Sequence, residues 1–257
     1  ILNEATLLNV MGEYKIIVVP EAENVPDIVK TALKDYVQQG GQLLISGTHV
    51  AQQYEELSGV VKAEGPLQGG WLPAGNGAVK VAGEYQPITL QSAEELAPML
   101  AQQDPELNKR GQVASTLNRY GAGRVAVIHG PIFQNYYRCR YPMMRRFIAD
   151  TMAALEVTSL IRVQGPWFIE MAARAKEGTI YLQFVNRSVS GYLSPNRHMV
   201  EHVPDAGAFT VLVPLSTRPK RCYMAPQPVG LNWTWNAGIL TAVIDGLHIH
   251  NILIIEK

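Results

Sequence analysis

Four polar side chains with possible chemical roles follow apolar runs that we expect to form buried strands. Ser46, Thr48 and His49 come directly after Leu43-Leu44-Ile45, and His129 comes directly after a second such run. Ligands of open α/β sheets bind at the carboxyl ends of the strands. These four residues are therefore candidates for a site.

The chemistry that these residues suggest is nucleophilic hydrolysis. Such an enzyme needs a serine or cysteine on a sharp strand-to-helix turn, with a base beside it. The turn Ser46-Gly47-Thr48-His49-Val50 is neither a G-x-S-x-G motif nor a cysteine elbow. His129, which precedes Gly130-Pro131, fits a buried histidine bonded to nearby backbone. We favour a structural role over a catalytic pair, with contact to a ligand as the third alternative.

Paired carboxylates are the second chemistry to consider, because glycoside cleavage uses two of them across the scissile bond. Acidic residues occur near the first expected strand, in an expected helix and in the second half of the chain. None of them has neighbours in the sequence that predict a raised pKa, so no catalytic acid is predicted among Glu13, Glu21, Glu23, Asp27, Glu94, Glu95, Glu170 and Asp245.

Aromatic residues interleaved with arginine form a third group. They gather in segments that we expect to be loops, and they suit a subunit interface, interdomain packing or, as the alternative, stacking on a sugar. The members are Trp71, Phe133, Tyr136, Tyr137, Arg138, Arg140 and Tyr141. We predict an interface or substrate-entrance role for Trp71, His49, His129, Tyr136, Tyr137 and Arg138.

Trp233 and Trp235 alternate on one expected strand. Period-two spacing places both rings on the same face of that strand. Such a pair most often belongs to the core of a β-sandwich, and a carbohydrate platform is the alternative.

Composition excludes several classes of partner. Basic and acidic residues both number 22, so the net charge is zero, which argues against nucleic acid and anionic membranes as partners. No apolar run is long enough to span a membrane and no signal peptide opens the sequence, so we expect a cytoplasmic location. The two cysteines, Cys139 and Cys222, are expected to be free thiols, and neither a metal nor a cofactor is expected.

The first half of the chain alternates strand and helix signals. Residues 15–20 form an apolar run typical of a strand buried on both faces, and residues 43–45 form the next strand. Between them we predict a helix capped by Asn24, with Pro26 in its first turn and an end at Gly40-Gly41. A strand–helix–strand unit of this kind implies a parallel, right-handed crossover.

The rest of the first half is less regular. We predict an insertion of short strands and loops from about Leu57 to Leu117, with strand pieces at 79–81 and 88–90 and a helix near 92–102. A strand at 124–128 and a helix at 142–155 follow. The opening residues Ile1 to Glu4 are expected to lie inside a strand, as in a fragment of a longer protein.

The second half is expected to contain strands only. The period of the apolar residues changes near Thr158, which divides the chain into domains at 1–157 and 158–257. Strands 167–171 and 179–185 flank Lys176-Glu177-Gly178 and predict a hairpin. Further strands are expected at 209–215, 221–224, 238–243 and 248–255. Short strands at near-regular spacing predict an antiparallel β-sandwich.

These segments, taken in order, resemble the C-terminal region of clan-A-type glycoside hydrolases. Tyr14 to Pro20, Tyr36 to Gly41 and Gln42 to Ser46 resemble the trimerisation domain of family 42 β-galactosidases. Gly165 to Trp167, Leu182 to Arg187 and Leu247 to Ile252 are similar to the closing β-sandwich of such enzymes. The resemblance implies a class I glutamine-amidotransferase-like (flavodoxin-like) α/β domain, with Ser46-Gly47-Thr48 in place of the cysteine elbow.

Two parts that the resemblance implies are missing from residues 1–257. One is the catalytic (β/α)₈ barrel with its carboxylates, which would be the N-terminal partner within a bacterial α-L-fucosidase or a β-galactosidase. The other is the first strand and helix of the α/β domain. The resemblance therefore implies a sheet that lacks a central strand, unless an unseen segment or another chain supplies it.

The function that we predict is that of a non-catalytic C-terminal fragment of a glycoside hydrolase. It would serve domain packing, homo-oligomerisation and the shaping of the active-site entrance, with loop 134–138 at subunit contacts. An independent amidotransferase-like hydrolase that uses Ser46 or Thr48 with a histidine is one alternative. A carbohydrate-binding module that uses Trp71 or the Trp233–Trp235 pair is the other.

Overall fold

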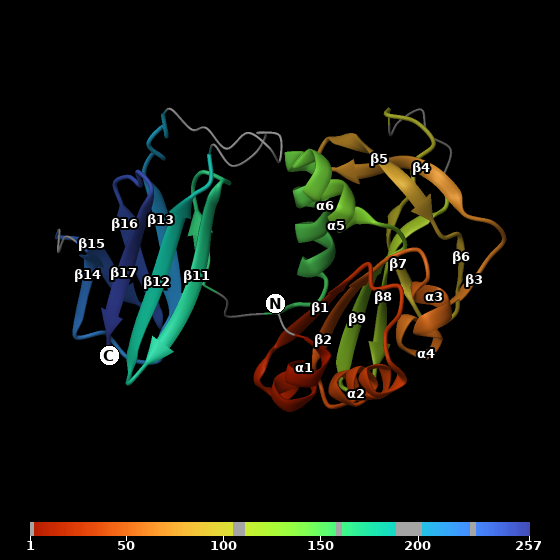
Figure 1. The fold of residues 1–257 in the computed structure, drawn as a ribbon, viewed down its shortest axis with the longest axis horizontal. Helices are drawn as coiled ribbons and strands as arrows, with labels where there is room; N and C mark the ends of the chain where they lie inside the picture. The colour runs from red at the N-terminus through yellow and green to blue at the C-terminus, as the bar shows by residue number, and fades with distance from the viewer. Residues whose placement is uncertain (1–2, 105–110, 158–160, 189–201, 227–229) are drawn as a thin grey trace. The chain divides into compact units, whose positions relative to one another are not determined.

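The computed structural model describes residues 3–104, 111–157, 161–188, 202–226 and 230–257. The chain divides into two compact units, residues 1–157 and 158–257, which are shown as ribbons in Figure 1. Thr158, the predicted boundary residue, lies outside the described residues.

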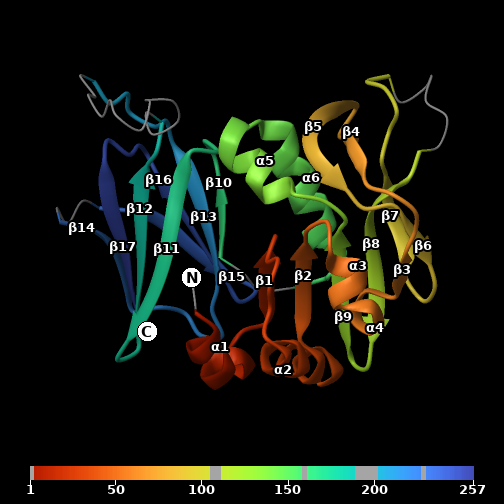
Figure 2. The same cartoon turned by 45° about the vertical axis from the view of Figure 1, so that its right-hand side comes forward.

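The first unit is built around a five-stranded mixed sheet. Parallel strands β1, β2 and β9 continue into the antiparallel strands β8 and β7, in the order β1-β2-β9-β8-β7. Figure 2 shows β1 at one end of this row. The bounds of the strands are β1 (Ile16–Pro20), β2 (Gln42–Ser46), β9 (Gly123–Ile128), β8 (Val113–Tyr120) and β7 (Glu94–Pro98).

Both faces of this sheet are covered, which explains its continuous apolar strands. One face packs on α2 (Asp27–Gln38), where Leu33 and Val37 meet Leu43 and Val125. The other face packs on α6 (Pro142–Ala153) and the hairpin of β4 (Leu67–Ala74) and β5 (Gly77–Tyr85). Side chains of a strand alternate between faces, so successive residues of β2 enter different cores.

Short elements complete the first unit. They are α1 (Glu4–Val10), the 3₁₀ helix η1 (Met11–Glu13), α3 (Val50–Gln53), α4 (Glu55–Ser58), β3 (Val60–Lys62), β6 (Ile88–Leu90) and α5 (Ile132–Cys139). β3 pairs with β6 and β4 pairs with β5, each as a separate two-stranded sheet. The predicted insertion of short strands is thus present, and β8 emerges from its last part.

Four of the sequence predictions are wrong. The segment near 92–102 contains strand β7 rather than a helix, because ladder bonds with β8 outweigh the helical preference of Glu, Leu and Ala. Loop 134–138 belongs to helix α5. Glu4 begins helix α1, capped by the side chain of Asn3, and does not lie in a strand. The cap of α2 is Pro26 and not Asn24.

The second unit consists of two four-stranded antiparallel sheets, as the alternation of its sequence predicts. One has the order β10-β13-β16-β15 and the other the order β11-β12-β17-β14. Their bounds are β10 (Arg162–Gln164), β11 (Ile169–Lys176), β12 (Thr179–Asn186), β13 (Phe209–Pro214), β14 (Arg221–Ala225), β15 (Asn232–Asn236), β16 (Ile239–Ile244) and β17 (His250–Glu256).

A single core joins the two sheets. Leu182, Phe184 and Leu253 from one sheet pack with Val211 and Leu240 from the other, and all five are fully buried. The unit is therefore a β-sandwich, and each central strand turns alternate side chains inward. The fold class of α/β unit followed by antiparallel β-sandwich agrees with the prediction.

Candidate functional site

The polar groups at the carboxyl end of the parallel strands converge on Glu21, which follows β1. Its Oε1 accepts a hydrogen bond from Ser46 Oγ at 3.1 Å and one from the Phe133 N–H at 2.8 Å. Its Oε2 accepts a bond from the Gln134 N–H at 3.1 Å. Phe133 and Gln134 lie in the first turn of α5, so one carboxylate ties two strand ends to the start of a helix.

Glu21 thus caps α5 from a position 112 residues earlier in the chain. The first N–H groups of a helix have no partner within the helix, and its N-terminus favours a negative charge. The capping geometry requires a left-handed backbone at Glu21, with φ of +43°, which a residue with a Cβ adopts at a cost. A strained backbone at a residue whose side chain satisfies three donors indicates a structural constraint on this edge.

Burial raises the pKa of the Glu21 carboxyl above its usual range, although the bonds from Phe133, Ser46 and Gln134 act in the opposite direction. This finding corrects the prediction that no acidic residue has a raised pKa. The signal is invisible in the sequence because the burying residues are distant along the chain.

His129 is buried, with 1% of its surface exposed, and its Nε2 lies 3.0 Å from Thr116 Oγ1. Burial lowers the pKa of its imidazole to about 3, so the ring is neutral at physiological pH. Its Nδ1 has no partner among the described residues. The main chain of His129 bonds Ala114 and Gln86. The favoured structural role agrees with these bonds.

Ser46 and His129, the catalytic pair considered as an alternative, are not hydrogen-bonded to each other. The hydroxyl of Ser46 is 1% exposed, and its bond goes to Glu21 and not to the imidazole. Thr48 Oγ1 donates to the Glu84 carbonyl at 2.9 Å, and His49 precedes the short helix α3. These bonds hold the turn in place, and neither Ser46 nor Thr48 is bonded to a histidine among the described residues.

Tyr85, at the end of β5, lies against the same edge. Its ring fills the space that a Cβ on Gly130 would need, because such an atom would lie 2.2 Å from the ring. Its hydroxyl has no hydrogen-bond partner among the described residues, and burial together with the Glu21 charge raises its pKa. Tyr85 was not predicted from the sequence, and its tight packing indicates a filled edge rather than an open cleft.

The predicted interface residues lie on regular elements rather than on loops. Trp71 lies in β4, where its main chain exchanges two hydrogen bonds with Leu100. Tyr136, Tyr137 and Arg138 lie in α5. Tyr136 packs partly against the core, whereas Tyr137 is 76% exposed and Arg138 is exposed. The residues predicted for one site therefore belong to three regions of the first unit.

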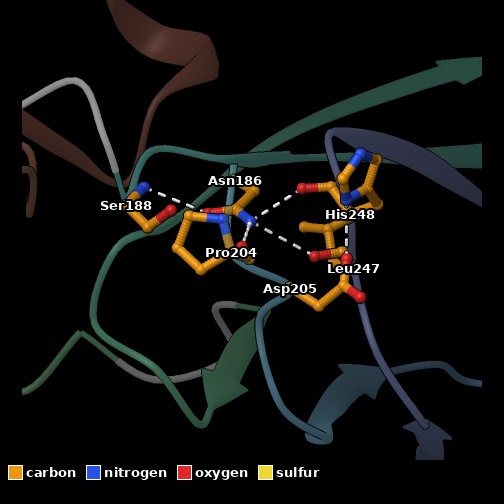
Figure 3. Close-up of polar contacts among 6 residues, drawn as sticks. All are labelled: Asn186, Ser188, Pro204, Asp205, Leu247 and His248. Carbon is orange, nitrogen blue, oxygen red and sulfur yellow. Dashed lines mark hydrogen bonds and ion pairs between the residues drawn. The ribbon is translucent and has the colours of Figure 1, made fainter. Parts of the chain in front are cut away.

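A second polar cluster lies in the sandwich and was not predicted. The buried Asn186 donates from Nδ2 to the carbonyls of Pro204 at 2.9 Å, Leu247 at 3.3 Å and His248 at 2.7 Å (Figure 3). Its Oδ1 accepts the Ser188 N–H at 3.0 Å. One amide thus satisfies backbone groups from two loops, which is a structural role.

His248 also pairs with Asp205, Nδ1 to Oδ1 at 2.6 Å, but both side chains are more than half exposed. An exposed pair of this kind is worth little to stability. No serine or cysteine bonds this pair among the described residues, so it lacks the third member of a catalytic triad.

Trp233 and Trp235 pack against the sandwich core, as the period-two spacing predicts. Trp235 Nε1 donates to the Leu215 carbonyl at 3.3 Å, and the guanidinium of Arg218 lies over the ring of Trp233 at 5.7 Å. Both rings are partly buried by these contacts.

Metal and membrane chemistry find no support in the described residues. No group of three or more metal-binding side chains occurs among them. No helix within the described ranges is long and apolar enough to cross a membrane. Cys139 and Cys222 are both free thiols.

Comparison of the fold with solved structures finds glycoside hydrolases that match nearly the whole chain. α-L-Fucosidase isoenzyme 2 from Paenibacillus thiaminolyticus matches 96% of this chain with a TM-score of 0.75 and 16% identity. The β-galactosidase from Bacillus circulans sp. alkalophilus matches 95% with a TM-score of 0.59 and 16% identity. A GH42 β-galactosidase from G. stearothermophilus, in a catalytic mutant form, matches 96% with a TM-score of 0.55 and 16% identity.

The chain shares its fold with part of these glycoside hydrolases. It spans 41% of the fucosidase and 33% and 32% of the two β-galactosidases, so each of them is more than twice as long. No protein-family model matches the sequence, and no curated protein matches it. At 16% identity the likeness establishes the fold and leaves the activity to be argued.

Proposed function

We propose that residues 1–257 form a non-catalytic region of a glycoside hydrolase of the α-L-fucosidase or β-galactosidase type. The observation that carries this proposal is the Glu21 carboxylate, which bonds the Ser46 hydroxyl and the first amides of α5. A serine hydrolase needs a hydroxyl paired with a base for attack and free N–H donors for the oxyanion. In this chain both the Ser46 hydroxyl and the first N–H groups of α5 donate to the Glu21 carboxylate instead.

The assembly partner in this proposal is the catalytic (β/α)₈ barrel of the same protein. The likeness to glycoside hydrolases extends over nearly the whole chain, while more than half of each relative lies outside the matched region. A region of this kind contributes by packing on the barrel, by joining subunits and by shaping the entrance to the active site.

The free edge of β1 supports a role in assembly. Gln42 N–H donates to the Lys15 carbonyl and Glu21 N–H donates to the Ser46 carbonyl, so the backbone groups of the alternate residues Ile16 and Val18 point away from β2. No described strand pairs with that side. A groove of about 360 Å³ runs along it, lined mainly by apolar residues of β1, α1 and α2. An additional strand in this groove would complete the sheet.

One face of α5 supports the formation of oligomers. Gln134, Tyr137 and Arg138 lie at helical spacing on α5, Tyr141 follows as the residue before α6, and all four are exposed. Tyr137 and Tyr141 are 76% and 54% exposed. Tyrosine and arginine are enriched where proteins meet, because they offer a large contact area with hydrogen-bonding ends. We assign this face to contact with a second copy.

An activity assay separates this proposal from an independent hydrolase. The purified 257-residue chain, incubated with nitrophenyl α-L-fucoside, β-D-galactoside and a glutamine amide substrate, is expected to show no turnover above the buffer rate. Ser46→Ala and His129→Ala variants serve as controls. Turnover by the wild-type chain that both variants abolish would refute the non-catalytic role.

Analytical ultracentrifugation tests the α5 interface. The variant Tyr137→Ala/Arg138→Ala is expected to associate at least tenfold more weakly than the wild type, because both changes remove exposed contact groups and leave the core intact. Arg174→Ala, an exposed change in the second unit, is the matched control and is expected to leave association unchanged. Equal association of the double variant and the wild type would exclude this face.

A further inference from the structure

A pocket of about 390 Å³ opens at one end of the β-sandwich. It lies where β14 and β16 end and where β15 and β17 begin, since Ala225 pairs with Ile252 and Asn232 pairs with Val243. Its size falls within the range of small-molecule sites, about 300–1,000 Å³. Of the residues considered above as site candidates, only Asp245 lines this pocket.

The floor of the pocket is apolar. Met224 and Ile244 are 7% and 4% exposed and belong to the sandwich core, and Leu231 packs against that core. These core side chains form the base of the pocket and do not fill it, so the base presents an apolar surface.

Asn251 replaces a core residue at this end. Leu253 and Ile255 are fully buried, and the alternation of strand β17 turns Asn251 toward the same interior side, opposite the buried Phe184. The side chain is half-buried, yet it has no hydrogen-bond partner among the described residues. The donor and the acceptor of this amide are therefore open to water or to a ligand in the pocket.

Two more polar side chains line the pocket without a partner in the described part of the chain. They are the carboxylate of Asp245 and the imidazole of His250, both exposed. The contrast with the neighbouring Asn186 cluster is informative, because there Asn186 and the His248–Asp205 pair all have partners (Figure 3). The amide of Asn186 and the His248–Asp205 pair are thus bonded within the sandwich, whereas no described residue bonds the side chains of Asp245 and His250.

The lining also defines the class of ligand. None of the residues that line the pocket is lysine or arginine, so an anion such as phosphate finds no countercharge there. A carboxylate, an amide and an imidazole accept and donate hydrogen bonds to neighbouring hydroxyl groups. The apolar floor suits a ligand with a C–H face. A neutral pyranose has both features, with hydroxyls around its rim and C–H groups on its faces.

We propose that this pocket binds one neutral monosaccharide unit, with Asn251 and Asp245 bonded to its hydroxyls and its C–H face on Met224 and Leu231. The site is separate from the assembly role proposed above, and its loss would leave that role untouched. It also differs from the carbohydrate platform expected at Trp71 or Trp233–Trp235.

NMR titration of the ¹⁵N-labelled chain tests the site. L-Fucose and D-galactose are expected to give saturable shifts at the amides of Gly246 and Asn251, with a dissociation constant of about 1–10 mM, which is weak on the scale of specific ligands. Asn251→Ala and Asp245→Ala are expected to weaken binding at least tenfold. Asp205→Ala, which breaks the nearby His248 pair outside the pocket, is the control and is expected to retain binding.

Two outcomes would overturn the proposal. One is the absence of shifts at Gly246 and Asn251 with either sugar at about 50 mM, well above the expected constant. The other is a set of shifts that mannitol reproduces or that Asn251→Ala leaves unchanged, which would indicate nonspecific contact. The unperturbed amides of the core strands report that each variant is folded.

Discussion

Replacement of Glu21 by alanine or glycine tests the cap of α5. Alanine removes the acceptor of two helix N–H groups, which costs about 0.5–2 kcal/mol for a cap. It also leaves the Ser46 hydroxyl, 1% exposed, without its acceptor, which costs about 1–3 kcal/mol. The Ser46–Glu21 bond is partly exposed, so we expect a total near the middle, about 2–4 kcal/mol.

Glycine makes the test specific, because Glu21 has a left-handed backbone with φ of +43°. Glu21→Gly removes the same bonds as Glu21→Ala, but it relieves a strain of about 1–2 kcal/mol. The greater conformational entropy of glycine in the unfolded chain offsets about 0.5–1 kcal/mol of that gain. Glu21→Gly is therefore expected to be about 0.5–1 kcal/mol more stable than Glu21→Ala, the reverse of the usual order.

Hydrogen exchange of the α5 amides measures both effects. A loss of about 3 kcal/mol in the opening free energy corresponds to exchange more than about 100-fold faster, since 1.4 kcal/mol is a factor of ten. The amides of the sandwich strand β12 are the internal control and should not change. Unchanged exchange in α5 for Glu21→Ala, or a less stable Glu21→Gly, would refute the assignment of Glu21 as a strained cap.

Three further predictions concern the same edge and the sandwich. Because burial raises the pKa of Glu21 in the folded state, the folded chain binds that proton more tightly than the unfolded chain does. The free energy of unfolding of the wild type should therefore fall as the pH rises from 4.5 through the folded pKa. Denaturant titrations at several pH values should show that Glu21→Gln lacks this pH-dependent part of the stability. Asn186→Ala should destabilise the sandwich by about 2–4 kcal/mol in chemical denaturation, because three carbonyls lose a donor, whereas His248→Ala should change it by less than about 0.5 kcal/mol. Gly130→Ala should lower the melting temperature and cost about 1–3 kcal/mol of folding stability, because the new Cβ would clash with the Tyr85 ring. In the background of Tyr85→Ala, which removes the ring, Gly130→Ala should have no such cost.

Periodicity predicted the strands β1, β2 and β9, most strands of the sandwich and the longer helices, because their apolar residues face a core directly. It missed α5 because the buried side of this helix includes Asn135. The Asn135 amide bonds both backbone groups of Ala82 at 2.8 Å, so a polar residue occupies a position where the pattern requires an apolar one. A buried amide that bonds the backbone of a strand, as a neighbouring strand would, cannot be detected from the spacing of apolar residues.

The contacts of the candidate site residues could not be predicted for a different reason. Residue types placed Ser46 and His129 at the correct edge of the sheet, since both end parallel strands there. The sequence could not show that Ser46 bonds Glu21, which lies 25 residues earlier, or that His129 is neutral and bonded to Thr116. Hydrogen bonds between distant segments depend on the packed fold. The spacing of residues in the sequence therefore could not decide which groups bond Ser46 and His129.

The strand β1 combines the sequence of a central strand with the position of an edge strand. Ile16 to Val19 form an uninterrupted apolar run, and Val18 is 39% exposed. Natural edge strands are usually protected by charge, proline or a bulge within the strand. β1 has only Pro20 at its end, and its pairing with β2 has no bulge. An apolar edge beside an apolar groove is an aggregation liability in water unless another segment covers it. This edge, together with the hydrogen-bonded carboxylate of Glu21, is the basis of our proposal of a role in assembly.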